Sequence, residues 1–569
     1  MDKSEIKSII LNIIPQTKSE GDTLKKKTAK DTYHIGGLSG NRLNSGTLRS
    51  QFIICDETEW NKCDPDTKKA IHSDQRIFVE RGDDVWDIYK GISLDSEKEE
   101  PALIRKSVTG LEELLKEERE AITISYHHPT IVSGESFVDN ETYRPYITAL
   151  RTKPFLLLAG ISGTGKSRIV REFAFKSCPD YLQDKDGTTP GNYCMIEVKP
   201  NWHDSTELLG YYSRLGSKPG YQFTKFVKFL VKAKMYPDVP FFVCLDEMNL
   251  APVEQYFAEI LSILETRKTV IGDDGKKTIK TDTIIDATHF KELREISGYT
   301  PSFTDRGIYM KLHDIDTESD IADEVGKRTE LTTEGLTLPD NVIIVGTVNM
   351  DDTTHRFSRK VIDRAMTIEM NGGNLRDMFG GSKNLEYLPK KEQEKWQNAF
   401  TCRYVTADEV LEAHPEVKDE LIEKLPVRLE NINQALKGTP FEVSYRVLNE
   451  LTIMVGVMLD EGKALDDAIN QSVNNILLMK ILPRVEGDAE MFALSREYKA
   501  KMGIEYDNRL EWLMKFAPDI KEASISAESD DADTEEKAEV VKKHQTTAKE
   551  KIQEMIDRLN NQEFTRYWP

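Results

Sequence analysis

Residues 154–167 read PFLLLAGISGTGKS, and the helical pattern RIVREFAF follows at residues 168–175. The first half is a short apolar run of the kind that forms a buried strand, and the second half fits G-x-x-x-x-G-K-S. A strand that passes through a glycine loop into a helix gathers backbone N–H groups and the positive end of the helix dipole around one anion. The stretch therefore predicts a phosphate-binding loop at the end of a strand.

Each part of this loop has an expected task. The glycines let the backbone close on a β-phosphate, Lys166 reaches the β and γ oxygens, and the hydroxyl of Ser167 is placed to ligate Mg²⁺. A glycine turn that arose by chance is the competing interpretation, and the strand-loop-helix order argues against it. We expect nucleotide contacts from Gly160, Ser162, Gly163, Thr164, Gly165, Lys166, Ser167 and Asp246.

A second motif, FFVCLDEMN at residues 241–249, ends an apolar run with two adjacent carboxylates. Buried carboxylates cost free energy unless they are paired or hold a metal. We expect Asp246 to hold Mg²⁺ together with Ser167, and Glu247 to act as the general base that polarises the attacking water. An acidic pair at the surface after a strand is the alternative, which the preceding phosphate-binding loop makes weaker.

Strand-like runs recur along the chain and alternate with helical stretches, which indicates an α/β fold with a parallel sheet covered by helices. These runs are PFLLLAG, YCMIEV, FFVCLDE and NVIIVGTVN. Further runs at QFIIC, RIFVE and DVWDIY predict a separate small α+β module, and no internal repeat is evident. We expect a module at 1–125, an α/β core at 126–375 with an insertion at about 267–338, a helical lid at 376–520, and an acidic linker with a last helix at 521–569.

This set of motifs resembles that of AAA+ proteins, which are ring-forming P-loop NTPases with an α/β core and a helical lid. The resemblance implies that Asn349, at the end of NVIIVGTVN, orients the water beside the γ-phosphate. It implies that Arg364 is the arginine finger offered to a neighbouring subunit, with Arg356 and Arg359 as alternatives. Arg446, in FEVSYRVLNEL, is expected to be a second sensor that reaches the γ-phosphate from the lid, although a plain surface arginine competes with that interpretation.

Between residue 154 and the C-terminus the chain is more specifically similar to the McrB branch of AAA+ proteins, the motor subunits of modification-dependent restriction systems. The resemblance implies a hexameric ring, DNA translocation and a separate McrC-type nuclease subunit. The stretches that carry it are KPNWHDSTELLGYY (199–212), CLDEMNLAPVEQYFAEILSILE (244–265), GTVNMDDTTHRFSRKVIDRA (346–365), MKILPRVEGD (479–488) and FTRYWP (564–569).

One element departs from the McrB pattern. Where the family has MNxxDR, this chain reads VNMDDT, so that Asn349 and Asp352 are retained and Thr353 replaces the usual arginine. This departure puts the family's preference for GTP in doubt, and the nucleotide is expected to be ATP or GTP, with Mg²⁺. The similarity does not extend to residues 1–125, where McrB-type proteins carry a variable DNA-reading module.

The composition limits the partners and the location. The chain has 569 residues and a formal net charge of -21, which argues against a general nucleic-acid coat, so DNA contacts are expected to be local. One candidate is the basic run Lys25–Lys27, for which a solvated loop is an equally good interpretation. No apolar run approaches the roughly 20 residues that cross a bilayer. We expect no membrane contact and a cytoplasmic location.

The sequence thus predicts Mg²⁺-dependent NTP hydrolysis by an oligomeric ring that moves or remodels DNA in a restriction or phage-defence complex. A MoxR-like chaperone that remodels a protein partner is one alternative, and a nucleotide-switched scaffold with little turnover is another. No pattern of a nuclease site is evident in the chain. Cleavage is therefore expected from a partner subunit.

Overall fold

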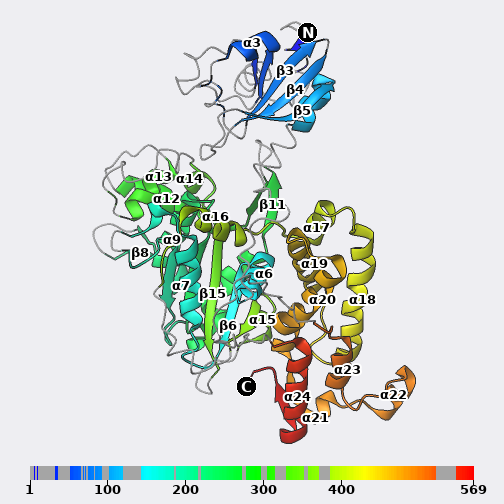
Figure 1. Cartoon of the computed structure of the whole chain (residues 1–569). Coiled ribbons are helices and arrows are strands. Elements are labelled where there is room, and N and C mark those ends of the chain that lie inside the picture. The colour runs from blue at the N-terminus through cyan, green and yellow to red at the C-terminus, as the bar shows by residue number, and fades with distance from the viewer. Residues whose placement is uncertain are drawn as a thin grey trace, which may run out of the picture. The chain divides into compact units, whose positions relative to one another are not determined.

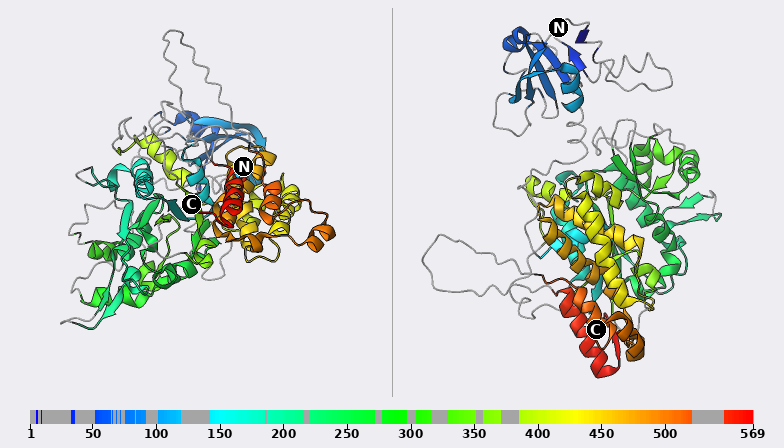
Figure 2. Two further views of the ribbon diagram at one scale, coloured as in Figure 1. Left: turned by 90° about the horizontal axis from the view of Figure 1, so that it is seen from below. Right: turned by 90° about the vertical axis from the view of Figure 1, so that its right-hand side faces the viewer.

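The computed structural model of this chain divides into two compact units, one within residues 1–130 and one within residues 131–569, and each is described by itself (Figures 1 and 2). No helix in the described parts of the chain is long and apolar enough to cross a membrane. The structure describes residues 5–6, 9, 33–35, 52–63, 65, 68, 71, 75–82, 84–91, 101–118, 142–184, 187–215, 220–271, 277–296, 304–313, 315, 329–350, 357–370, 385–520 and 546–568.

The first unit is a five-stranded sheet with apolar clusters on both faces. The runs QFIIC, RIFVE and DVWDIY form β2, β3 and β4, as predicted from their strand-like composition. The first three strands are parallel, and the last three form antiparallel pairs. The elements are β1 (Tyr33–Ile35), β2 (Phe52–Asp56), α3 (Glu57–Lys62), β3 (Arg76–Gly82), β4 (Val85–Lys90) and β5 (Ala102–Thr109).

The second unit is built on a five-stranded, fully parallel sheet in the order β16-β6-β15-β10-β7. The strands are β6 (Phe155–Gly160), β7 (Tyr193–Glu197), β10 (Phe241–Asp246), β15 (Val342–Asn349) and β16 (Met366–Glu369). Strand β6 lies between β15 and β16, so the chain adds strands first on one side of β6 and finally on the other. In open parallel sheets, ligands bind beyond the carboxyl ends of the strands at such a reversal of order.

The strands of this sheet are apolar almost throughout because both faces are covered. Alternate residues of β6 enter different clusters, with Leu156 and Leu158 on one face and Phe155 and Leu157 on the other. The core helices and the short 3-10 turns are α6 (Arg144–Thr152), α7 (Lys166–Ser177), η2 (Asp180–Leu182), α8 (Thr206–Leu209), α9 (Lys225–Met235), η3 (Met248–Leu250), α10 (Val253–Tyr256), α11 (Ala258–Leu264) and α15 (Arg359–Ile362).

Small strand pairs and short helices lie within the connections between strands of the parallel sheet. The segment predicted as an insertion at 267–338 runs between β10 and β15 and contains two strand pairs and three helices in its described parts. A further strand pair, β8 (Tyr211–Ser213) with β9 (Gly220–Gln222), precedes α9. The elements of the insertion are β11 (Lys268–Ile271), β12 (Lys277–Lys280), β13 (Thr283–Ile285), α12 (Ala287–Ile296), α13 (Asp305–Leu312), α14 (Glu330–Thr333) and β14 (Leu336–Thr337).

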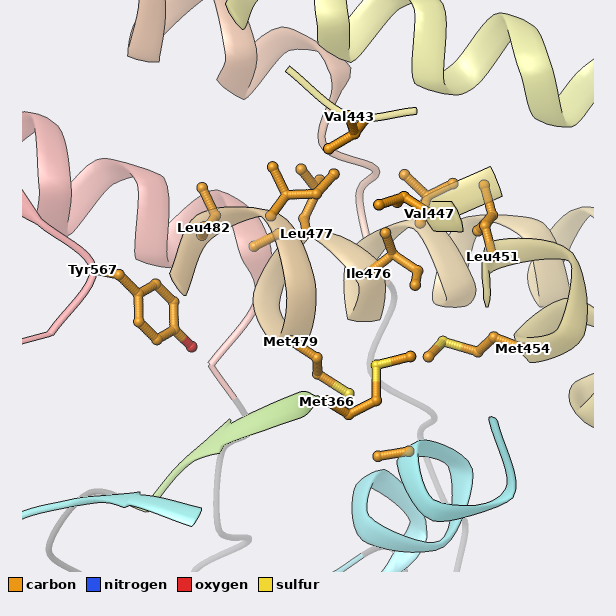
Figure 3. Close-up of a cluster of buried hydrophobic side chains, with 14 of the residues drawn as sticks. Met366, Val443, Val447, Leu451, Met454, Ile476, Leu477, Met479, Leu482 and Tyr567 are labelled. Carbon is orange, nitrogen blue, oxygen red and sulfur yellow. The ribbon is translucent and has the colours of Figure 1, made fainter. Parts of the chain in front are cut away.

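The helical C-terminal part shares a core with one face of the sheet. Figure 3 shows Met366 of edge strand β16 pointing toward Met454 and Met479 of this part. Its elements are α16 (Lys390–Ala399), α17 (Ala407–Ala413), α18 (Lys418–Leu436), α19 (Tyr445–Asp460), α20 (Leu465–Ile476), the π-helical turn η6 (Leu477–Ile481), the 3-10 turn η7 (Leu482–Arg484), β17 (Glu486–Asp488), α21 (Ala489–Phe492), α22 (Arg496–Met502), α23 (Arg509–Phe516), α24 (Ala548–Gln562) and β18 (Phe564–Arg566).

The last helix belongs to this lid, although the sequence groups it with the acidic linker. Ile552 and Met555 of α24 are fully buried in the cluster that the lid shares with the sheet, and β18 pairs with β17. Lys551 extends from α24 to Glu369, the last residue of β16, and its Nζ lies 2.6 Å from Glu369 Oε2. Both side chains are more than nine-tenths buried. The C-terminal helix therefore completes the edge of the sheet.

The buried pair between Lys551 and Glu369 predicts a clear stability effect. Replacing Lys551 with Met should lower the free energy of unfolding by about 3–5 kcal/mol, because the carboxylate of Glu369 would remain buried without its partner. Lys549→Met is the matched control on the same helix, since Lys549 pairs with Asp519 at the exposed surface and such pairs contribute about 0–1 kcal/mol. Urea unfolding followed by circular dichroism would measure both, and equal midpoints for the two variants would contradict the assignment.

Candidate nucleotide-binding site

The loop after β6 has the backbone shape that its glycines predict. Gly160, Gly163 and Gly165 have φ angles of 153°, 84° and 83°. A Cβ on Gly160 would lie 2.3 Å from the carbonyl oxygen of Met370, whereas a Cβ on Gly163 or Gly165 would meet no heavy atom within 4 Å. The first glycine thus permits close packing on the strand beside it, and the other two border open space into which a phosphate fits.

The start of α7 is prepared for an anion. Gly165 is the N-cap of α7 and supplies no side-chain hydrogen bond to the first turn, which leaves helix N–H groups available to a ligand. The Nζ of Lys166 donates to the carbonyl oxygens of Gly160 and Ile161 at 3.1 and 2.7 Å, so that the ammonium lies within the loop. Burial lowers the pKa of Lys166, while the charges of Asp246 and Glu247 oppose that shift.

Asp246 is held by two hydroxyl groups at the carboxyl edge of the sheet. The Oγ of Ser167 donates to Asp246 Oδ1 at 2.5 Å, and the Oγ1 of Thr347 donates to the same oxygen at 2.8 Å. The hydroxyl of Thr347 also accepts from the backbone N–H of Glu247 at 2.9 Å. Three separate segments, from α7, β10 and β15, therefore meet at one carboxylate.

Glu247 and Asn349 are neighbours in space. The Nδ2 of Asn349 donates to Glu247 Oε1 at 3.0 Å, and Asn249 donates to the backbone oxygen of Asn349 at 2.9 Å. Glu247 has a φ of 51°, which places a non-glycine residue in the left-handed region. This conformation costs on the order of 1 kcal/mol or more and turns the carboxyl group away from the strand direction that Asp246 follows.

The arrangement suits one divalent cation held mainly by water and phosphate. Ser167 and Asp246 offer two hard oxygen ligands beside the open loop, and Mg²⁺ commonly uses only one or two carboxylates together with water and phosphate oxygens. Among the described residues, no group of three or more His, Cys, Asp or Glu side chains could hold a metal by itself. The residues present therefore fit Mg²⁺ that arrives with a nucleotide.

Arg364 and Arg446 lie at the opposite edge of the sheet. Arg364 precedes β16 by two residues, and Met366 at the start of β16 is in register with Leu156 near the start of β6. Arg446 Nη2 lies 2.7 Å from Glu265 Oε2, and Nη1 pairs with Asp363. The six residues of β6, at roughly 3.3 Å per residue, put about 17 Å between this amino edge and the phosphate-binding loop.

This position changes the expectation for Arg446. A second sensor that reaches from the lid to the γ-phosphate of its own chain is incompatible with a side chain anchored to Asp363 and Glu265 at the amino edge. The sequence shows that Arg446 begins an amphipathic helix but not how that helix docks. Arg359 lies on α15, where its guanidinium packs over the ring of Phe441. Arg356, Asp352, Thr353 and the basic run 25–27 lie outside the described residues.

Two polar residues of the site were not predicted. Thr347 is 2% exposed and links Asp246 to Glu247, and Asn249 is 3% exposed and supports Asn349. The signal for Thr347 is its polar side chain within an apolar run, two residues before Asn349 and therefore on the same face of the strand. Asn249 follows the acidic pair by two residues and carries no comparable signal.

The chain is similar to one protein family and to solved structures. The model of a family described as a domain of unknown function (DUF8727) matches residues 399–564, which include α17 to α24. No curated protein matches the chain. Among solved structures, the chain is similar to a candidate ATPase from Cytophaga hutchinsonii, with 15% identity, coverage of 73% of this chain and 100% of that chain, and a TM-score of 0.32.

The hydroxyl of Thr347 allows a direct test of the site geometry. Thr347→Val keeps the shape but removes the link between Asp246 and Glu247 and leaves the N–H of Glu247 without its acceptor. We expect kcat for NTP hydrolysis to fall roughly tenfold or more, since a misplaced base costs about 1–3 kcal/mol, with little change in nucleotide affinity. Thr347→Ser is the control that keeps the hydroxyl. Equal kcat values for the Val and Ser variants would show that the link has no role.

Proposed function

We propose that this chain is a Mg²⁺-dependent nucleoside-triphosphatase of the AAA+ type that works as a ring. The observation that carries the proposal is the chain of hydrogen bonds from Ser167 through Asp246 and Thr347 to Glu247 and Asn349, beside a glycine loop at a helix N-terminus. A phosphate cradle, two metal ligands and a carboxylate beside an amide donor are the parts that phosphoryl transfer to water requires.

Each residue has a role in the proposed reaction. The N–H groups of the loop and Lys166 bind the phosphates, and Ser167 with Asp246 would hold Mg²⁺, which supplies charge neutralisation on the phosphate oxygens when bound. Glu247 accepts a proton from the attacking water, and Asn349 keeps that carboxylate oriented. No other group in the described part of the chain combines these contacts.

The separation of the two edges supports the proposed ring. Arg364 and Arg446 cannot reach the phosphate-binding loop of their own chain, yet both guanidinium groups lie together at the amino edge. In a head-to-tail assembly, that edge would face the carboxyl edge of the next subunit, and a cyclic contact of this kind closes a ring. We propose a homo-oligomer, expected to be a hexamer, in which Arg364 serves the neighbour's nucleotide.

The biological role rests on the sequence resemblance to McrB-type motors. On that basis we propose ATP or GTP as substrate, DNA as the object that is moved or remodelled, and an McrC-like nuclease subunit as the partner within a restriction or phage-defence complex. Remodelling of a protein partner, as in MoxR-like chaperones, and a nucleotide-switched scaffold are the competing outcomes of the experiments that follow.

The first experiment tests the chemistry. Lys166→Ala should lose tight NTP binding, whereas Glu247→Gln should bind NTP and hardly hydrolyse it, because only the second variant keeps the phosphate cradle intact. Titration with a fluorescent nucleotide and a phosphate-release assay would separate the two effects. Nucleotide affinity in Lys166→Ala equal to that of the unchanged protein would contradict the assignment of the loop.

The second experiment tests the object of the motor. The hydrolysis rate should rise on addition of DNA and rise further with an McrC-like nuclease subunit, while the isolated chain with Mg²⁺ and NTP should leave DNA uncut. Stimulation by a protein substrate without DNA would favour the chaperone, and nucleotide binding with no turnover under any condition would favour the scaffold. Glu247→Gln serves as the control for contaminating NTPases.

A further inference from the structure

Residues of the lid contact the turn that carries Arg364 on both sides of that residue. Arg484 Nη1 lies 3.1 Å from Asp363 Oδ1, and Arg446 pairs with the second oxygen of the same carboxylate. The Nζ of Lys480 donates to the carbonyl oxygen of Ala365 at 3.1 Å. We call residues 363–365 the finger turn. Three cations from three lid elements, α19, η6 and η7, thus converge on the two residues that flank Arg364.

Arg364 itself is held much more loosely. Its Nε lies 4.0 Å from Glu265 Oε1, and its Nη1, although buried, makes no hydrogen bond to any described residue. The lid therefore fixes the backbone and the neighbours of Arg364, whereas the guanidinium keeps a nitrogen that has no partner among the described residues. This is the arrangement expected of a side chain that must be presented in a defined place to a group outside its own chain.

Lys480 occupies an unusual position for such a contact. Its side chain is fully buried, and its charge is balanced by Glu450, whose Oε2 lies 2.9 Å from Nζ. Glu450 is also 2.7 Å from Lys153 Nζ at the start of β6, and Lys153 reaches Glu265 at 3.6 Å. Lys480 belongs to the π-helical turn η6, and such turns are rare and often occur at functional sites.

General adhesion between core and lid is the competing explanation, and other contacts already serve it. Arg151 of α6 pairs with Glu461 at the end of α19 at 3.1 Å, with both side chains more than nine-tenths buried. The apolar contact of Met366 with the lid core adds to this adhesion. The cations on the finger turn are therefore an addition to the contacts that hold the lid in place.

We propose that Lys480 and Arg484 are positioning residues that set Arg364, so that the lid of one subunit controls hydrolysis in its neighbour. This inference rests on the proposed action of Arg364 on a second copy of the chain. A movement of the lid would pull on the backbone at Asp363 and Ala365 and shift Arg364 relative to the neighbour's γ-phosphate. Misplacing a charge by about 1 Å is enough to lose a large part of its catalytic effect.

Mixed rings test the inference because they separate the two sides of an interface. Glu247→Gln subunits have an inactive site but an intact finger, and Arg364→Ala subunits have the reverse, so a mixture should regain hydrolysis. Lys480→Met placed in the Glu247→Gln subunit should reduce that recovered rate roughly tenfold or more. Lys480→Met placed in the Arg364→Ala subunit should leave the recovered rate and the nucleotide affinity within about twofold.

Further variants keep the test decisive. Arg484→Gln should show the same one-sided loss and provides an independent test if Lys480→Met does not fold, which circular dichroism would reveal. Glu461→Gln, which weakens the adhesive pair with Arg151, should show no difference between the two sides. Equal losses on both sides, or a loss only in the Arg364→Ala subunit, would overturn the positioning role. No recovery in the reference mixture would instead overturn the trans action of Arg364, and this inference with it.

Discussion

One hydroxyl group links the two halves of the candidate site. Thr347 donates its single proton to Asp246 and accepts the backbone N–H of Glu247, so it fixes the end of β10 against β15. Without such a link, the backbone N–H of Glu247 would lose its acceptor at the end of a buried strand. The positions of Ser167, Glu247 and Asn349 all depend on this geometry. Thr347 has no expected chemical step of its own, but it holds in place residues that have such a step.

The parallel sheet imposes a second constraint, which is polarity. All five strands run the same way, so the phosphate-binding loop and the acidic pair lie at one edge, and the arginines lie at the other. A single chain cannot bring the two edges together, because the strands between them are rigid and buried. The lid contributes Arg446 to the edge at which the arginines lie, and it packs on β16, the strand next to β6. The division into two edges is therefore a property of the fold.

The sequence was most informative where local chemistry dictates local structure. The apolar runs that become β6, β10 and β15 and the glycines of the loop are recognisable because burial and positive φ angles restrict the choice of residues. The proximity of Asp246 to Ser167 follows from parallel strands ending at one edge. Thr347 and Asn249 were missed because their partners lie 100 residues or more away along the chain. The contacts of Arg446 could not be predicted either, because amphipathic periodicity shows which face of a helix is buried but not which element covers that face.

The pairing of Lys551 with Glu369 spans 182 residues and joins the last helix to the edge strand beside the phosphate-binding loop. During synthesis, Glu369 leaves the ribosome well before its partner, and at 5–20 residues per second the delay is about 10–40 s. Throughout that interval Glu369 has no Lys551 to pair with, and the helix that packs beside it is absent. The edge strand can therefore reach its final packing only after α24 has been made.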